Sequence, residues 1–136
     1  MTAQPMSPGT VGIVLVSHSA GLAEGAAHLA AQVSGGTVTI VAAGGTDDGE
    51  LGTSAAKVER ALSQAQGGAG VVVLPDLGSA VLTVRAVLED LAGARVLLAD
   101  APFVEGAVAA TVMAAAGGDV KAVVAAAEEA RHARKL

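Results

Sequence analysis

Four short runs of β-branched and other apolar residues recur along the chain, and a segment with helical character follows each of them. The run Val71–Leu74 contains no polar residue, so it shows no alternation between an apolar and a polar face. Strands of this kind are typical of parallel sheets that helices cover on both faces. We predict strands over residues 11–17, 37–42, 70–74 and 95–99. The sequence therefore predicts an α/β fold with three α/β/α layers and a mainly parallel sheet.

The helical segments between these runs have recognisable ends. Gly35 and Gly36 end the first helix, Thr53 is the predicted N-cap of the second, and Asp119 caps the last. Pro102 opens the fourth helix, at the position where its missing N–H costs least. We predict helices over residues 22–33, 54–65, 79–91, 102–116 and 119–134. No linker divides the chain, so residues 11–136 are predicted to form a single domain behind a flexible lead at residues 1–10.

Composition excludes several classes of protein. The formal net charge is -5 and the few basic residues are scattered or gathered near the end, which argues against nucleic-acid binding. Cysteine is absent, so neither a disulfide nor a thiolate metal site can form. The N-terminal segment lacks a signal-peptide pattern and no apolar stretch of about 18 residues occurs, so we expect a soluble, cytoplasmic protein that does not enter a membrane.

Polar and small residues follow each predicted strand. In an open parallel sheet the carboxyl ends of the strands meet at one edge, where ligands bind. The segments expected there span residues 17–19, 44–54, 75–79 and 100–106. The candidates for phosphate binding, each of which can instead be an ordinary helix cap, are Ser19, Gly52, Thr53, Ser54, Gly78 and Ser79.

His18 is the strongest candidate for chemistry at this edge. It follows an apolar strand and precedes a helix start, where free backbone N–H groups attract anions such as phosphate. A neutral imidazole is a competent nucleophile at cellular pH, whereas the alternative interpretation is a structural histidine at a strand end. His28 lies within a predicted helix and His132 in the charged tail, so we expect both at the surface.

Asp76 follows the third predicted strand and is open to two interpretations. Its carboxylate can accept a hydrogen bond from one nitrogen of His18, which would orient the ring and leave the other nitrogen to attack. It can equally cap the following helix, and the two roles are compatible with each other. Pro75 forces an extended conformation on Leu74 and removes an N–H at the strand end, which bears on how Asp76 approaches His18.

The motifs of several other chemistries are absent. The sequence contains no Gly-Lys pair for a P-loop, no dinucleotide fingerprint after the first strand and no Gly-x-Ser-x-Gly nucleophile elbow. His18 and Asp76 supply too few ligands for a metal, so we predict no metal site. The chemistry that remains is a histidine that carries a phosphoryl group.

Four segments of the chain also match a known family in their order and spacing. They are Ile13–Ser19, Gly52–Val58, Asp76–Ala80 and Ala101–Ala107. Together they resemble the phosphocarrier subunits of phosphoenolpyruvate-dependent dihydroxyacetone kinases, whose fold is that of the mannose-type IIA domains of the sugar phosphotransferase system. The resemblance covers nearly all of residues 11–130.

This resemblance implies a phosphoryl relay, with His18 in the position of the family's phosphorylated histidine. His18 would accept a phosphoryl group from the phosphocarrier protein HPr and pass it to ADP on the nucleotide subunit of the kinase, as a component of a phosphoenolpyruvate-glycerone phosphotransferase. No tightly bound cofactor is implied, only the transient phosphoryl group. The resemblance also implies a homodimer, a sheet order of 2-1-3-4 and a docking surface around His18.

Two other functions stay open at this point. One is the IIA component of a mannose-type sugar transporter, which delivers its phosphoryl group to a IIB protein and often continues into that domain through a linker. The other is a non-catalytic regulatory module that binds a control protein when His18 is phosphorylated. Because the chain stops at Leu136 without such a linker, we expect the kinase branch and a separate donor protein.

Overall fold

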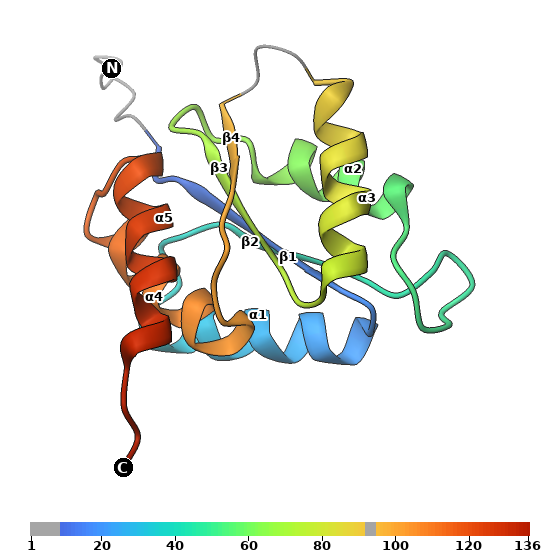
Figure 1. Cartoon of the computed structure of the whole chain (residues 1–136). Coiled ribbons are helices and arrows are strands. Elements are labelled where there is room, and N and C mark those ends of the chain that lie inside the picture. Colours follow the sequence, from blue (N-terminus) through green and yellow to red (C-terminus); the bar gives the residue numbers. More distant parts are fainter. Residues whose placement is uncertain (1–8, 92–94) are drawn as a thin grey trace.

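Four parallel strands form the centre of the molecule. A computed structural model describes residues 9–91 and 95–136 (Figure 1), so most of the predicted lead at residues 1–10 lies outside the described residues. The strands are β1 (Gly12–Ser17), β2 (Ile40–Gly44), β3 (Val71–Pro75) and β4 (Val96–Leu98). Neighbouring strands pair in parallel in the order β2-β1-β3-β4, which confirms the predicted α/β fold and sheet order.

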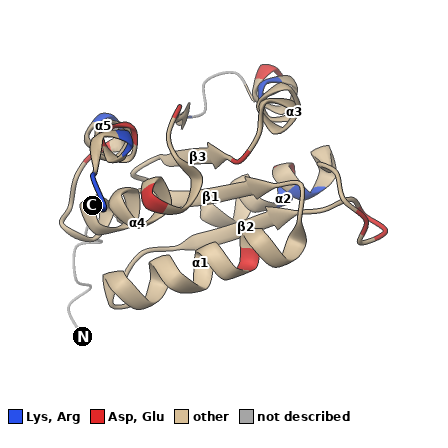
Figure 2. Cartoon of the chain, turned by 60° about the horizontal axis from the view of Figure 1, so that its bottom comes forward, with Lys and Arg blue, Asp and Glu red and all other residues tan. Residues whose placement is uncertain are grey.

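Helices cover both faces of this sheet (Figures 1 and 2). One face packs against α1 (Ala20–Ser34), α4 (Phe103–Ala115) and α5 (Val120–Glu129), and the other against α2 (Ala55–Ala65) and α3 (Gly78–Glu89). Alternate residues of β1 enter the two cores, as the period of a strand requires: Leu15 enters the first and Val16 the second. Within the described ranges, no helix is both long and apolar enough to span a membrane.

The region between β2 and α2 differs from the prediction. β2 covers residues 40–44 instead of 37–42, because its pairing with β1 continues to Gly44. Thr53 pairs with Gly45 in an isolated parallel β-bridge and therefore lies outside the helix. Ser54 is therefore the N-cap of α2 in place of Thr53, and its hydroxyl accepts a hydrogen bond from the Lys57 N–H at 3.1 Å.

Other helix ends shift by smaller amounts. The hydroxyl of Ser19 caps α1, which therefore begins before the predicted residue 22, and α3 ends at residue 89 rather than 91. Pro102 is the N-cap of α4 rather than its first helical residue, whereas Asp119 caps α5 as predicted. α5 ends at Glu129 and a short 3₁₀ turn follows, instead of the predicted helix to residue 134. The side chain of Arg131 binds the carbonyl oxygen of Glu128, which satisfies a helix-end acceptor there.

The loop between β2 and α2 lies against the turn between β1 and α1. A Cβ atom at Gly44 would lie 2.5 Å from the carbonyl oxygen of Ser19, so only glycine permits this approach. Gly52, whose φ of +146° favours glycine, donates its N–H to the carbonyl oxygen of His18 at 2.9 Å. These two contacts bring the loop to the end of β1, where His18 lies.

Candidate functional site

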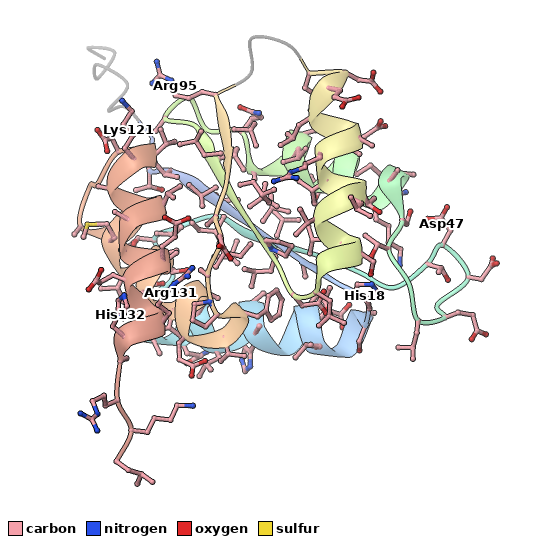
Figure 3. The ribbon with its side chains drawn as sticks, viewed as in Figure 1. His18, Asp47, Arg95, Lys121, Arg131 and His132 are labelled. Carbon is pink, nitrogen blue, oxygen red and sulfur yellow. The ribbon has the colours of Figure 1, made fainter. Side chains whose placement is uncertain are left out.

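His18 lies at the carboxyl end of β1, between the N-terminal ends of α1 and α3 (Figure 3). The preceding residue, Ser17, is fully buried, whereas the side chain of His18 is 23% exposed. The following residue, Ser19, accepts a hydrogen bond from the Leu22 N–H at 3.2 Å and so caps α1. The imidazole is therefore held at the surface edge of the sheet, with one side against the protein. His28 and His132 are exposed, as predicted.

The Asp76 carboxylate holds one side of the His18 ring. Because β3 is the parallel neighbour of β1, the residues that follow the two strands meet at the same edge. Oδ1 of Asp76 accepts hydrogen bonds from His18 Nδ1–H at 3.0 Å and from the Leu77 N–H at 2.7 Å. Oδ2 accepts from the His18 backbone N–H at 3.1 Å and from the Ser17 hydroxyl at 2.8 Å. Four donors therefore fix this carboxylate.

These contacts assign the proton of the neutral His18 ring. An ionised carboxylate can only accept hydrogen bonds, so the ring nitrogen that faces Asp76, Nδ1, carries the hydrogen. The other nitrogen, Nε2, then presents its lone pair, toward which the hydroxyl of Ser79 is directed. Ser79 lies in the first turn of α3, where backbone N–H groups have no partner within the helix.

The surroundings of Asp76 keep it ionised. Partial burial raises the pKa of the carboxyl, but the hydrogen bonds from the His18 ring and the Ser17 hydroxyl, together with those from the backbone N–H groups of His18 and Leu77, outweigh that effect. The pKa therefore lies below its ordinary value. An ionised carboxylate next to Nδ1 favours the neutral tautomer whose hydrogen lies on that nitrogen.

The helix-cap interpretation of Asp76 is wrong. Leu77 is the N-cap of α3 and provides no side-chain cap, while Asp76 precedes it and directs its carboxylate to His18. Pro75 does not prevent the contact, because it continues β3 opposite Val16 and leaves the Asp76 side chain within reach of the ring.

The structure brings only some of the six predicted phosphate-binding residues against His18. Ser79 contacts the ring and Gly52 contacts the backbone, whereas the hydroxyl of Ser54 donates to Asp47 at 2.6 Å. The hydroxyl of Ser19 is occupied by its capping bond, and Gly78 begins α3 beside Ser79. The buried Oγ1 of Thr53 has no hydrogen-bond partner among the described residues.

The residue that sequence reasoning missed is Ser17. It ends an otherwise apolar strand and directly precedes His18, so its sequence position signals that a polar side chain is buried beside the site. Its side chain contacts Asp76, which lies 59 positions further along the chain. That contact follows from the pairing of β1 with β3, which the sequence alone does not reveal.

The pH dependence of stability tests the contacts of Asp76. Asp76→Asn is expected to destabilise the protein by about 1–3 kcal/mol near neutral pH, because an amide nitrogen would face a backbone N–H. Since the folded-state pKa of Asp76 is lowered, its stabilisation is complete above the ordinary pKa and is lost as pH falls through the folded-state pKa. Urea unfolding of both proteins should therefore show a constant difference from about pH 7 to about pH 5, which shrinks as the pH is lowered further.

The matched control is Asp48→Asn, a carboxylate in the exposed loop before α2. Its effect on the free energy of unfolding should stay within about 0.5 kcal/mol at each pH. If the cost of Asp76→Asn were constant or larger in acid, the hydrogen bonds to its carboxylate would not be the source of the stabilisation.

A family model covers most of the chain. The EIIA-man family, described as "PTS system fructose IIA component", matches residues 12–124, a range that includes His18, Asp76 and Ser79. The curated relatives carry more specific names. The phosphoryl donor subunit DhaM of a PEP-dependent dihydroxyacetone kinase from Escherichia coli (strain K12) is 41% identical over 131 residues, which are 92% of this chain and 28% of that protein.

A shorter relative comes from Listeria innocua and is named as the phosphoryl donor subunit DhaM of PEP-dependent dihydroxyacetone kinase 2. It is 34% identical over 117 residues, which are 84% of this chain and 94% of that protein. The chain thus spans just over a quarter of the E. coli relative and nearly all of the Listeria one.

Two crystal structures share the fold. A protein of unknown function has a TM-score of 0.78 at 32% identity, with 88% of this chain and 94% of that chain covered. A sigma-54 interaction domain protein from Enterococcus faecalis has a TM-score of 0.67 at 20% identity, with 86% and 87% covered, and shows likeness of fold alone. The family match and the relatives agree: the chain belongs to the EIIA-man family and is related to the DhaM phosphoryl donor subunits.

Proposed function

We propose that His18 accepts a phosphoryl group from HPr and transfers it to ADP bound on the nucleotide subunit of a dihydroxyacetone kinase. The observation that carries the proposal is the hydrogen bond from His18 Nδ1 to Asp76, which leaves Nε2 as the free nucleophile at the sheet edge. The relatives' names, which describe phosphoryl donor subunits of such kinases, support the choice of acceptor system. The chain would then be one component of a phosphoenolpyruvate-glycerone phosphotransferase.

Each transfer exchanges one bond to phosphorus for another. In the first, the Nε2 lone pair forms a bond to phosphorus while the bond from phosphorus to the donor's side chain breaks and returns its electron pair to the donor. In the second, a terminal phosphate oxygen of ADP forms the new bond, and Nε2 recovers its electron pair. The Nδ1 proton stays on the ring beside Asp76, whose negative charge stabilises the phosphorylated imidazole.

The first turn of α3 is suited to the phosphoryl group. The Ser79 hydroxyl that faces Nε2 can donate to a phosphoryl oxygen instead, and the N–H groups at Gly78 and Ser79 lie at the positive end of the helix dipole. Thr53, whose buried hydroxyl has no hydrogen-bond partner among the described residues, belongs to the same proposed set. The other members of the proposed phosphate-binding set are Ser19, Gly52 and Ser54. To bind a phosphoryl oxygen, Gly52 and Ser54 would exchange their present acceptors, the His18 carbonyl oxygen and Asp47.

Exposed leucines surround the site and suit a protein partner. Leu51 is 80% exposed, Leu77 60% and Leu82 68%, and these are the largest exposed fractions among the described large apolar side chains apart from the C-terminal Leu136. Leu77 follows Asp76, Leu82 lies one turn beyond Ser79 on α3, and Leu51 precedes Gly52. An apolar rim of this kind marks a protein contact.

The acidic side chains beside the site favour a phosphoryl donor protein whose docking face is basic. The loop that carries Leu51 also carries the exposed residues Asp47, Asp48 and Glu50, visible as the red tip of the loop between β2 and α2 in Figure 2. Such a tip attracts basic partners and speeds their encounter. The proposal also includes a homodimer, for which α4 offers exposed apolar side chains at Val112 and Met113.

Labelled phosphate tests the relay. Phosphoenolpyruvate, enzyme I and HPr should label the full chain, and the label should reach ATP when the ADP-loaded nucleotide subunit of the kinase is added. His18→Ala should abolish labelling, because no other histidine among the described residues is held by a carboxylate, while His28→Ala should accept label at the wild-type rate. Label that stops on His18 would contradict the kinase relay in favour of a IIB protein or a control protein as acceptor. A labelled His18→Ala protein would refute the site itself.

The leucine rim makes a separate prediction about protein docking. Leu82→Glu places a charge on the proposed contact surface and should slow phosphoryl transfer from HPr by about tenfold, as removal of a good interface contact does. Val33→Glu is the matched control, because Val33 is 53% exposed at the far end of α1 from His18. Initial rates at subsaturating HPr measure the effect. Equal rates for both variants would show that α3 is outside the docking surface.

A further inference from the structure

Ser17 contributes a buried hydroxyl that the mechanism above does not yet use. Its side chain is fully buried, a state that Thr111 shares among the described polar side chains. A hydroxyl without a hydrogen bond in such a place costs free energy, so its partners reveal its role. Thr111 donates to the carbonyl oxygen of Ala107 at 2.7 Å, one turn earlier in its own helix. Ser17 instead donates its hydrogen bond to Asp76 in the functional site.

Two hydrogen bonds fix the direction of the Ser17 proton. The N–H of Ser19 donates to Ser17 Oγ at 3.0 Å, which occupies one of the two acceptor positions of that oxygen. The single hydroxyl proton is directed to Oδ2 of Asp76 at 2.8 Å. Because Ser19 is also the N-cap of α1, the start of that helix anchors the hydroxyl.

The Ser17 hydroxyl in turn sets the rotation of the Asp76 carboxylate. With Oδ2 held by Ser17 and by the His18 backbone N–H, the other oxygen, Oδ1, is left to face Nδ1 of the His18 ring. Loss of the hydroxyl would leave Oδ2 with a single donor. The carboxylate could then turn, and the ring would lose the partner that selects its Nδ1–H form.

We propose that Ser17 is a positioning residue for phosphoryl transfer, which acts through Asp76 to keep His18 in the Nδ1–H form with Nε2 free to attack. The consequence for phosphoryl transfer rests on the proposed function. A ring that carries its hydrogen on Nε2 has no lone pair there with which to attack phosphorus. The structural part of the inference, the effect of Ser17 on the tautomer of His18, stands independently of any donor or acceptor protein.

Ser17→Ala in the full chain tests the proposal with two readouts. Nitrogen NMR of the His18 ring should show the Nδ1–H form in the wild type and a mixture of the two neutral forms in Ser17→Ala. The initial rate of labelling by phosphorylated HPr should fall by about tenfold, the effect expected for loss of one hydrogen bond to a charged group. Ser17→Thr, which keeps the hydroxyl, should restore both the spectrum and most of the rate.

Thr111→Val is the matched control, because Thr111 is the other fully buried polar residue among those described, and the change removes its hydroxyl with little change in shape. It should lower the melting temperature as Ser17→Ala does, but leave the ring spectrum and the labelling rate unchanged. Circular dichroism checks that each variant is folded. If Ser17→Ala does not fold, Ser17→Cys replaces it, since a thiol of similar size is a weaker donor and should produce an intermediate shift.

The outcomes separate this inference from the proposed function. A folded Ser17→Ala protein with the wild-type ring spectrum and labelling rate would overturn the positioning role. If the ring spectrum changes but even the wild-type protein accepts no label from HPr, Ser17 positions His18 and the proposed relay fails. A fall in rate without any change in the ring spectrum would also overturn the inference, because the effect would not act through the tautomer.

Discussion

The hydrogen bond between His18 Nδ1 and the Asp76 carboxylate determines what the rest of the sheet edge can do. It assigns the ring proton to the inner nitrogen and leaves the outer nitrogen, Nε2, to react. The bond exists because β1 and β3 are parallel neighbours, so that residues 58 positions apart follow adjacent strand ends. The apolar sheet and the helices that cover it thus hold His18 Nδ1 and Asp76 Oδ1 at a distance of 3.0 Å.

The same edge combines a rigid inner side with an accessible outer side. Inside, the buried Ser17 and the backbone N–H groups of His18 and Leu77 hold Asp76. Outside, Ser79 and the start of α3 lie beside Nε2 among exposed leucines. The proposed phosphocarrier role needs both properties, because such a protein must orient one nitrogen and yet present it to two different partners. A deep pocket would serve an enzyme with a small substrate better.

Much of this was predictable from the sequence. Unbroken apolar runs such as Val71–Leu74 predicted buried parallel strands, and the rule for carboxyl ends placed His18 and Asp76 together. The sequence left the role of Asp76 open, because a carboxylate before a helix fits a cap as well as a partner for histidine. It also missed that Thr53 pairs with Gly45 and that Ser17 bonds to Asp76. The first contact is a bridge within the loop that follows β2, and the second depends on the pairing of β1 with β3, so neither is marked by a local motif.

The role of the Asp76 contact can be read from the site of phosphorylation on the ring. Nitrogen and phosphorus NMR of the chain labelled at His18 will identify which ring nitrogen is bonded to phosphorus. We expect an Nε2 adduct with the Nδ1 proton retained beside Asp76. An Nδ1 adduct would contradict this expectation, because the carboxylate would then have to leave the ring before the phosphoryl group could arrive.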